Sequence, residues 1–450
     1  MRRRRRKALP QDPIILDIEK LSHEGRGIAH LADGKVVFVD EALPGEQVSA
    51  IYTSKRENFD EVKTQEVIKA STDRVNPECE YASICGGCSL QHFESSAQLA
   101  FKDSVLHEKL EHSIGRQDYQ KMSALTGPVF GYRRKARLAV RYVHKKEQVL
   151  VGFREKANSF ITNMDSCAVL DKQVSALIPV LAQLIRSLKS YQHIPQIEVA
   201  VGDKVGDANS CALVFRHLQM LPPSDLKKFS DFAEEHCLDL YLQSAGLASV
   251  VKHYPPDSEA RLHYQLPDYN LTMAFHPMDF TQVNADINHS MLASALELLD
   301  LKKTDKVLDL FCGLGNFTLP MATKAASVVG VEGSDEMVLR GNENAQKNEL
   351  TNCSFYCADL FKPVAGMAWL NSDYDKILLD PPRSGALEVL KDVTACKPER
   401  IVYISCNPAT LARDAAQLEE FGYQLTSAGV MDMFPQTTHV ESIALFLPKK

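Results

Sequence analysis

The sequence lacks features that would assign it to several common classes of protein. No apolar run reaches the ~18 residues that a membrane-spanning helix needs, so we expect no membrane partner. The charged start of the chain has no apolar stretch behind it, which argues against a secretory signal. We therefore expect a cytoplasmic protein whose 11 cysteines are reduced thiols or metal ligands, not disulfides.

Phosphate-binding signatures are also missing or incomplete. There is no Walker lysine, and the loop Gly313-Leu-Gly315 is only part of the dinucleotide fingerprint. A net charge of -7 does not by itself indicate a nucleic-acid partner, but the charge is uneven. Arg2 to Lys7 is an unbroken basic run, which predicts a disordered cationic arm.

A second basic stretch, Gly131 to Arg141, alternates basic and apolar residues and predicts a strand with a cationic face. Phosphate contact is one interpretation of this face, and simple solvation is the other. The basic residues concerned are Arg133, Arg134, Lys135, Arg137 and Arg141.

Length and pattern indicate several domains. A chain of 450 residues corresponds to about three domains. Short alternating strands from Ile14 to Lys69, with turns at Asp33-Gly34 and Pro44-Gly45, predict a small β-barrel. Such barrels often bind nucleic acid, although a purely structural barrel fits the pattern as well. Helices are expected over Ser95–Ser113 and over Val174–Leu188.

Four cysteines form a candidate metal site. Cys79, Cys85 and Cys88 lie within ten residues, with Gly86-Gly87 between the last two, and Cys167 is a fourth. Four thiolates can hold tetrahedral zinc or an iron–sulfur cluster, and the residues alone do not choose between them. Unliganded thiols are the competing interpretation.

The half of the chain that starts at Phe275 alternates strands and helices, which predicts a doubly wound sheet. Its first strand ends in the glycine loop, and the second strand, Ser327 to Glu332, ends in an acid about twenty residues further on. An acid in that position suits a ribose hydroxyl, so a nucleoside cofactor is favoured over a phosphate ligand.

A thiol and a carboxylate mark two later strand ends. The predicted strand Ile401 to Ile404 stops at a turn with Cys406; Pro408 cannot continue a strand, and a helix is expected to begin near Ala409. Glu441 stands just before the apolar run that starts at Ser442. Ligands bind outside the carboxyl ends of strands in open α/β sheets, so we interpret these residues as a nucleophile and a base. A buried thiol and a solvated strand start are the simpler interpretations.

Together these motifs resemble the bacterial RNA uracil-5-methyltransferases that use S-adenosylmethionine, and most closely their iron–sulfur branch, which makes 5-methyluridine in 23S ribosomal RNA. The resemblance covers nearly the whole chain. Leu21 to Ala29 is similar to the start of the family's N-terminal TRAM barrel, Ser405 to Pro408 to its nucleophile motif, and Phe434 to Glu441 to its general-base motif.

The resemblance implies a role for each motif residue. Cys406 would be the nucleophile and Glu441 the general base, and Cys79, Cys85, Cys88 and Cys167 would ligate a [4Fe–4S] cluster. The implied contacts to S-adenosylmethionine come from six positions, which are Gln282, Phe311, Asn316, Glu332, Asp359 and Asp380.

The resemblance also implies an architecture, a monomer and 23S ribosomal RNA as the partner. A class I (Rossmann-like) methyltransferase domain would follow an OB-like TRAM barrel and a central α/β domain that carries the cluster. The implied division is 1–70 for the barrel, 71–95 with 127–275 for the central domain, and 96–126 with 276–450 for the catalytic domain.

The chemistry agrees with these residues. Uracil C5 is a weak nucleophile until a thiolate adds to C6. A base must then remove the C5 proton, a role that typically contributes ~10²–10⁴ in rate. A free thiol with a pKa near ~8.5 needs local activation, and the sequence does not show its source.

Three other functions fit parts of the pattern. Asp380-Pro-Pro-Arg383 loosely resembles a motif of amino-methyltransferases, which need no cysteine. Radical S-adenosylmethionine enzymes use three cysteines and leave one iron open, whereas four cysteines are present here. A non-catalytic RNA-binding or assembly factor would not need Cys406 and Glu441.

Overall fold

The computed structural model describes residues 9–370 and 373–449. The predicted arm Arg2–Lys7 lies outside these residues. The chain divides into two units. The first runs to Lys102 and includes Pro435–Thr438; the second holds Asp103–Phe434 and the chain from His439 onward. The predicted division into three domains at the boundaries given above stays a prediction.

The first unit contains a six-stranded sheet in the order β1-β5-β6-β4-β3-β2. Its strands are β1 (Ile14–Asp17), β2 (Lys20–Leu21), β3 (Gly27–His30), β4 (Val36–Asp40), β5 (Gln47–Lys55) and β6 (Phe59–Lys69). The hairpin predicted at Asp33-Gly34 joins β3 to β4, and Gly34 takes the left-handed φ of 83° that such turns need. Val37, Val48 and Val62 lie in its core.

Strand β6 is much longer than the predicted Glu66–Lys69 segment. Its first half was not evident from the apolar pattern because Asp60 occupies an inward position. That carboxylate is fully buried, and Lys35 pairs with it at 2.7 Å. A buried carboxylate, paired with a partly exposed lysine, thus replaces an apolar residue in the alternation.

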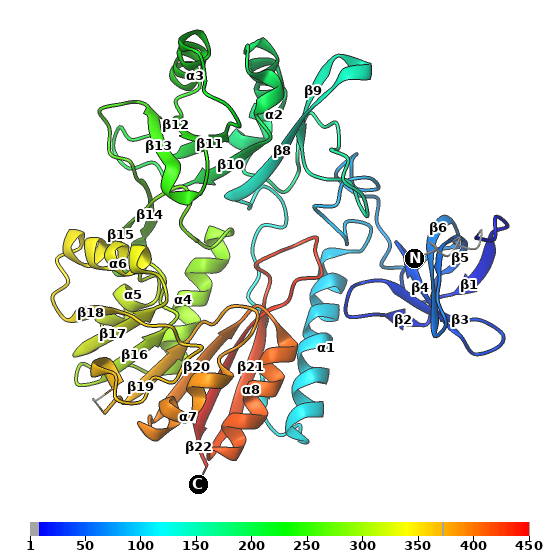
Figure 1. The fold of residues 1–450 in the computed structure, drawn as a ribbon. Helices are drawn as coiled ribbons and strands as arrows, with labels where there is room; N and C mark the ends of the chain where they lie inside the picture. Colours follow the sequence, from blue (N-terminus) through cyan, green and yellow to red (C-terminus); the bar gives the residue numbers. More distant parts are fainter. Residues whose placement is uncertain (1–8, 371–372, 450) are drawn as a thin grey trace, which may run out of the picture. The chain divides into compact units, whose positions relative to one another are not determined.

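The second unit contains a six-stranded sheet in the order β13-β12-β11-β10-β8-β9 (Figure 1). Its elements are β8 (Lys135–Val143), β9 (Gln148–Gly152), α2 (Lys172–Ser187), β10 (Gln196–Val201), β11 (Cys211–Arg216), α3 (Pro223–Glu235), β12 (Asp239–Gln243) and β13 (Val250–Tyr254). Helix α2 packs against β9, and α3 packs against β12 and β13. The predicted cationic strand begins only at Lys135, because the N–H groups of Arg133 and Arg134 bond Val169 and Val283.

An eight-stranded sheet in the same unit follows the order β18-β17-β16-β19-β20-β22-β21-β7. Its strands are β7 (Gln120–Lys121), β16 (Lys306–Leu310), β17 (Ser327–Glu332), β18 (Cys353–Cys357), β19 (Lys376–Leu379), β20 (Arg400–Ser405), β21 (Tyr423–Met431) and β22 (Glu441–Pro448). The five strands β16 to β20 are mutually parallel. Strand β22 lies between β20 and β21 and is antiparallel to both. The predicted doubly wound sheet is confirmed.

The remaining elements surround this sheet. They are α1 (Ser95–Ile114), the hairpin β14 (Leu262–Leu266) and β15 (Leu271–Phe275), α4 (Ala285–Leu299), α5 (Thr318–Ala322), α6 (Asp335–Lys347), α7 (Leu387–Ala395) and α8 (Pro408–Glu420). Short 3-10 turns are η1 (His144–Lys146), η2 (Tyr191–His193), η3 (Leu247–Ser249), η4 (Pro267–Tyr269) and η5 (Ala368–Leu370). Across residues 9–370 and 373–449, no helix combines the length and apolar character needed to span a bilayer.

Candidate active site

The strand order of the large sheet reverses between β16 and β19, and this reversal positions the site. Ligands of doubly wound sheets bind outside the carboxyl ends of the strands at such a switch point. Phe311 follows β16 and Asp380 follows β19, and the Asp380 N–H donates to Leu310 O at 3.2 Å. Two of the six predicted cofactor contacts therefore lie side by side at the switch point.

Glu332 ties the glycine loop to the end of β17. Its Oε2 accepts the Gly313 N–H at 3.1 Å, and its Oε1 accepts the Gly333 N–H at 2.7 Å. Phe311 has a left-handed φ of 64°, which is costly for a bulky residue, and its N–H donates to Val331 O at 2.9 Å. These hydrogen bonds hold the glycine loop against the end of β17.

Two residues that the sequence did not single out, Tyr264 and Asn288, bind Asn316 and line a cavity together with Gln282. Tyr264 donates its hydroxyl to Asn316 Oδ1 at 2.9 Å, and Asn288 exchanges two amide hydrogen bonds with Asn316 at 2.8 and 3.2 Å. Tyr264, Asn288 and Gln282 line one small cavity. Neither Tyr264 nor Asn288 carries a motif signal, because each is fixed only by packing between β14, α4 and the loop after β16.

Three carboxylates gather at this edge of the sheet. Burial, and then repulsion from Glu332, raise the pKa of Asp380 to about 7. Burial raises the pKa of Asp309 to about 8, against the hydrogen bond from Thr318, with further repulsion from Asp380 and Glu332. One oxygen of Asp309 is buried without a partner. An acidic site of this kind favours a cationic ligand.

Asp359 differs from the other predicted cofactor residues in being exposed. It follows β18, accepts the Phe361 N–H at 3.1 Å and pairs with Lys362 at 2.9 Å. The hydrogen bond from Lys362 lowers the pKa of its carboxyl group. Its place after β18 puts it at the same edge of the sheet as Glu332, because Ala358 N–H bonds Glu332 O at 2.9 Å.

The structure brings Cys406 and Glu441 together through the pairing of β20 with β22. Ser405 is the register partner of Ser442. Cys406 follows Ser405, and Glu441 precedes Ser442, so both lie at the same end of two adjacent strands. Burial raises the pKa of the Cys406 thiol to about 11, and repulsion from Glu441 and then Asp380 adds to the effect. In this state the thiol is protonated.

Arg383 is the cation that opposes this shift, and sequence reasoning did not assign it a role. Its charge lowers the pKa of Cys406. The Asn407 side chain donates to Arg383 O at 3.0 Å, and the Thr410 hydroxyl donates to it at 3.2 Å. The sequence could have indicated this role, because Arg383 ends the Asp380-Pro-Pro-Arg383 loop, which follows a strand that leads to the site.

The predicted cationic face is mostly engaged within the protein. Arg134 pairs with Asp203 at 2.6 Å, and Arg137 pairs with Glu198 at 2.5 Å. Lys135 donates to the backbone oxygen of Asp279, and its burial lowers the pKa of its ammonium group to about 8. Alternation along the extended chain also places Arg134 on the opposite side from its neighbours. Phosphate contact by these residues stays a prediction.

The middle of the predicted base motif belongs to the first unit. Gln436 is buried there, with a left-handed φ of 67°. Its carbonyl oxygen accepts the N–H groups of Ser89 and Leu90, each at 3.0 Å. Its side chain accepts from Gln98 at 3.0 Å, and its own N–H donates to Gln98 at 3.1 Å. The chain that leads to Glu441 is therefore anchored by residues that directly follow Cys88.

The four predicted cluster cysteines take part in no disulfide. Cys79, Cys85 and Cys88 lie in the first unit, and Cys167 lies in the second. Cys85 and Cys167 are buried, and the Gly87 N–H donates to Cys85 Sγ at 3.4 Å. Within the described ranges, the structure assembles no group of three or more His, Cys, Asp or Glu side chains that could hold a metal ion. The cluster stays a prediction.

Known families match most of the chain. The model of the tRNA (Uracil-5-)-methyltransferase family matches residues 95–450, and that of the TRAM domain matches residues 15–59. The chain is 53% identical to a protein of Hahella chejuensis named 23S rRNA (uracil(1939)-C(5))-methyltransferase RlmD, over 98% of this chain and 99% of that one. A protein of the same name from Alcanivorax borkumensis is 51% identical, over 98% of each chain.

A solved structure shows the same fold. It is the Pyrococcus abyssi tRNA (uracil-54, C5)-methyltransferase in complex with S-adenosyl-L-homocysteine, with a TM-score of 0.72 and 23% identity, over 96% of this chain and 100% of that one. The fold and the strand-edge site define a class I methyltransferase with an N-terminal TRAM domain. The chain belongs to the tRNA (Uracil-5-)-methyltransferase family, as its motifs predicted.

The raised pKa of Cys406 predicts slow alkylation at neutral pH. We expect iodoacetamide to modify Cys406 more slowly than the exposed Cys237, with a rate that rises about tenfold per pH unit up to pH ~10. Glu441→Gln should increase the rate by removing a repelling charge, and Arg383→Gln should decrease it. Site-resolved mass spectrometry measures both. A rate that levels off near pH 7 would show a thiolate already stabilised in the free protein.

Proposed function

We propose that this protein transfers a methyl group from S-adenosylmethionine to C5 of a specific uridine in 23S ribosomal RNA. The observation that carries the proposal is the placement of Cys406 beside Glu441 at the edge that also carries Glu332 and Asp380. The names of relatives about half identical over nearly the whole chain support ribosomal RNA as the substrate. The family description names tRNA instead, so tRNA is the second substrate to test.

The residues at the switch point fit S-adenosylmethionine. When bound, this cofactor supplies an electrophilic methyl group on a cationic sulfur. The uncompensated carboxylates Asp309 and Asp380 suit a cation, and Glu332 keeps acceptor capacity for ribose hydroxyls beside the three backbone N–H bonds that it accepts. We assign cofactor contacts to the predicted set, which is Gln282, Phe311, Asn316, Glu332, Asp359 and Asp380.

In the proposed reaction Cys406 Sγ forms a bond to C6 of the uracil ring, and the C5–C6 double bond shifts its electrons toward C5 and O4. C5 would then acquire the methyl group as the methyl–sulfur bond breaks, with S-adenosylhomocysteine as the leaving group. Glu441 removes the C5 proton, the C5–C6 double bond forms again, and the bond to Cys406 Sγ breaks. Burial is the main cause of the raised pKa of Cys406, and a cation near Asp380 would reduce the repulsion that adds to it; Arg383 acts in the same direction.

The rest of the chain is assigned to RNA binding and to a cluster. We propose RNA binding for the TRAM barrel over residues 1–70, a central domain over 71–95 and 127–275, and a catalytic domain over 96–126 and 276–450. Pairing of β7 with β21 supports placing residues 96–126 with the catalytic sheet. Ribosomal RNA as substrate supports a cytoplasmic location, and we propose a monomer.

We further propose a [4Fe–4S] cluster on Cys79, Cys85, Cys88 and Cys167. Four cysteine thiols outside any disulfide, with a backbone N–H directed at Cys85 Sγ, have the donor chemistry of such a site. Methyl transfer contains no redox step, so the proposed role is structural. Ser89 and Leu90, which follow Cys88, bind the carbonyl of Gln436 in the base motif. Ordering the cysteine segment would thus order the chain that leads to Glu441.

The pKa of Asp380 predicts that cofactor affinity depends on pH. A carboxyl group with a raised pKa is protonated below about pH 7, and a cationic ligand prefers its ionised form. S-adenosylmethionine should therefore bind roughly tenfold more tightly at pH 8 than at pH 6. S-adenosylhomocysteine, whose sulfur is neutral, is the matched ligand and should show a smaller change. Calorimetry measures both; equal pH profiles, or an unchanged profile in Asp380→Asn, would contradict the assignment.

Two variants separate the proposed roles of the catalytic residues. Glu441→Gln should still add to C6 and methylate C5, but the retained C5 proton should trap methylated RNA on the protein. Cys406→Ala should form no adduct and transfer no methyl group. Denaturing gels with labelled RNA and labelled methyl donor, run with 23S and tRNA transcripts, show both outcomes. Turnover by Cys406→Ala would overturn the mechanism, and normal turnover by Glu441→Gln would overturn the role of Glu441 alone.

The cluster proposal predicts iron in the purified protein. Preparation without oxygen should give a brown protein with about four iron atoms per chain. Cys85→Ser should lose most of the iron, whereas Cys237→Ser, at an exposed cysteine outside the proposed set, should keep it. Metal analysis that found one zinc and no iron would replace the cluster with a zinc site.

A further inference from the structure

The second unit has a pocket in its six-stranded sheet, away from the carboxyl edge of the large sheet. Its volume is about 420 Å³, which is within the usual range for small-ligand sites. The lining comes from β8, from the chain after it, from the 154–161 loop and from the turn at Tyr191. Of the motifs above, the predicted cationic face reaches this pocket through Arg141.

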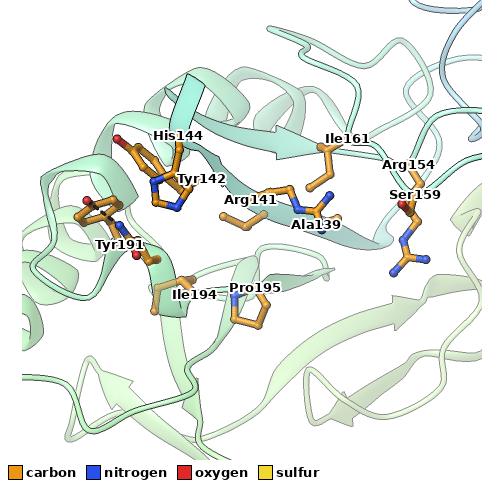
Figure 2. Close-up of a pocket in the computed structure, with 12 residues that line it drawn as sticks. Ala139, Arg141, Tyr142, His144, Arg154, Ser159, Ile161, Tyr191, Ile194 and Pro195 are labelled. Carbon is orange, nitrogen blue, oxygen red and sulfur yellow. Dashed lines mark hydrogen bonds between the residues drawn. The ribbon is translucent and has the colours of Figure 1, made fainter. Parts of the chain in front are cut away.

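The two ends of the pocket have different chemistry (Figure 2). Tyr142, His144 and Tyr191 gather at one end, and Arg154 with Ser159 lies at the other, with Arg141 between them. The rings of Tyr142 and Tyr191 meet edge to face at 4.8 Å. The guanidinium of Arg186 lies over both rings, at 5.5 and 5.0 Å from their centres. The aromatic end is therefore braced by the protein itself.

The arginines of the pocket differ from their neighbours on β8. Arg134 and Arg137 are neutralised by Asp203 and Glu198. Arg141 and Arg154 are exposed, and neither has an ion-pair partner in the part of the chain that the structure describes. The segment 141–146 also carries the basic residues His144, Lys145 and Lys146, and it contains no acidic residue. Two exposed guanidinium groups beside an aromatic surface are suited to phosphate and to a planar base.

We propose that this pocket holds one unpaired nucleotide of the RNA substrate, at a distance from the uridine that is methylated. The base lies against Tyr142 and Tyr191, and Arg141 and Arg154 bind the flanking phosphates. This inference rests on the proposed function, because it takes RNA as the substrate. It makes the pocket a specificity site, since a nucleotide must be unpaired to enter it.

The connection to the active site follows from β8. The guanidinium of Arg133, just before this strand, lies 6.0 Å from the ring of Phe434, where the base motif begins. Arg141 is eight residues further along an extended chain, or up to about 26 Å at ~3.3 Å per residue. Strand β8 therefore runs from the start of the predicted base motif, at Phe434, to the proposed nucleotide pocket. RNA that follows β8 would reach both.

The test combines RNA binding with methylation kinetics in the full-length protein. In Arg141→Gln/Arg154→Gln, we expect KM for the RNA transcript to rise about tenfold, with kcat and S-adenosylmethionine affinity unchanged. The slope of log K against log salt should become shallower by about 0.7 for each phosphate that the variant no longer neutralises. Tyr191→Leu should weaken RNA binding about fivefold or more, while Tyr191→Phe should retain it. Lys227→Gln, at an exposed lysine of α3, is the matched loss of charge and should change none of these.

The other possible results distinguish a failure of the pocket proposal from a failure of the proposed function. If the wild-type protein methylates RNA but the arginine pair leaves KM and the salt slope unchanged, the pocket proposal is wrong and the proposed function stands. If the wild-type protein methylates no RNA, the proposed function fails, and RNA binding by the variants still tests the pocket. Tight binding of uridine or adenosine monophosphate that requires Arg141, without any effect on RNA, would reassign the pocket to a free nucleotide. Competition by an acidic peptide alone would reassign it to a protein partner.

Discussion

The antiparallel pairing of β20 with β22 is the constraint on which the site depends. Its register places Ser405 opposite Ser442, and both are buried. The Ser442 hydroxyl donates to Ser405 O at 3.3 Å across the pair. A slip of one residue would turn each side chain of the strand to the other face. Glu441 would then leave the edge at which Cys406 stands. Helix α8 adds to this constraint, because the Tyr403 hydroxyl on β20 donates to the buried Asp414 of α8 at 2.6 Å.

The second feature of the site is an excess of negative charge in a buried place. Glu441 and Asp380 raise the pKa of the Cys406 thiol, and Arg383 is the cation that opposes them. Asp309 and Glu332 interact with Asp380 in turn. Proteins rarely bury carboxylates without compensation, since desolvation disfavours the charged form. The raised pKa values of Asp309 and Asp380 express this cost in the free protein. Under the proposed function, S-adenosylmethionine would lower this cost, and the same charges would link its binding to ionisation of Cys406.

The basic residues show why charge in a sequence is a weak guide to a binding surface. The run from Arg133 to Arg141 has five cations, yet Arg134 and Arg137 pair with acids and Lys135 is buried against a backbone oxygen. Arg141 of β8, which has no ion-pair partner among the described residues, instead lines a pocket together with Arg154 of the 154–161 loop. The useful quantity is the charge left after internal pairing, and pairing partners such as Asp203 and Glu198 are distant in sequence from the residues they neutralise.

The sequence by itself determined the family, the doubly wound sheet and the strand ends, because local signals are strong there. Glycines, prolines and acids mark where the strands end. A motif residue stands at or just after each of these ends, as Glu332, Asp380 and Cys406 do. Tertiary structure decided which neighbours those residues have, how far they are buried, and hence their pKa values. The register of β20 and β22 set the neighbour of Cys406, and burial set its pKa. Packing of β14 and α4 brought Tyr264 and Asn288 to Asn316. The inward Asp60 hid half of β6 from the apolar pattern. Pairing, desolvation and packing each depend on residues far apart along the chain, so a local pattern cannot contain them.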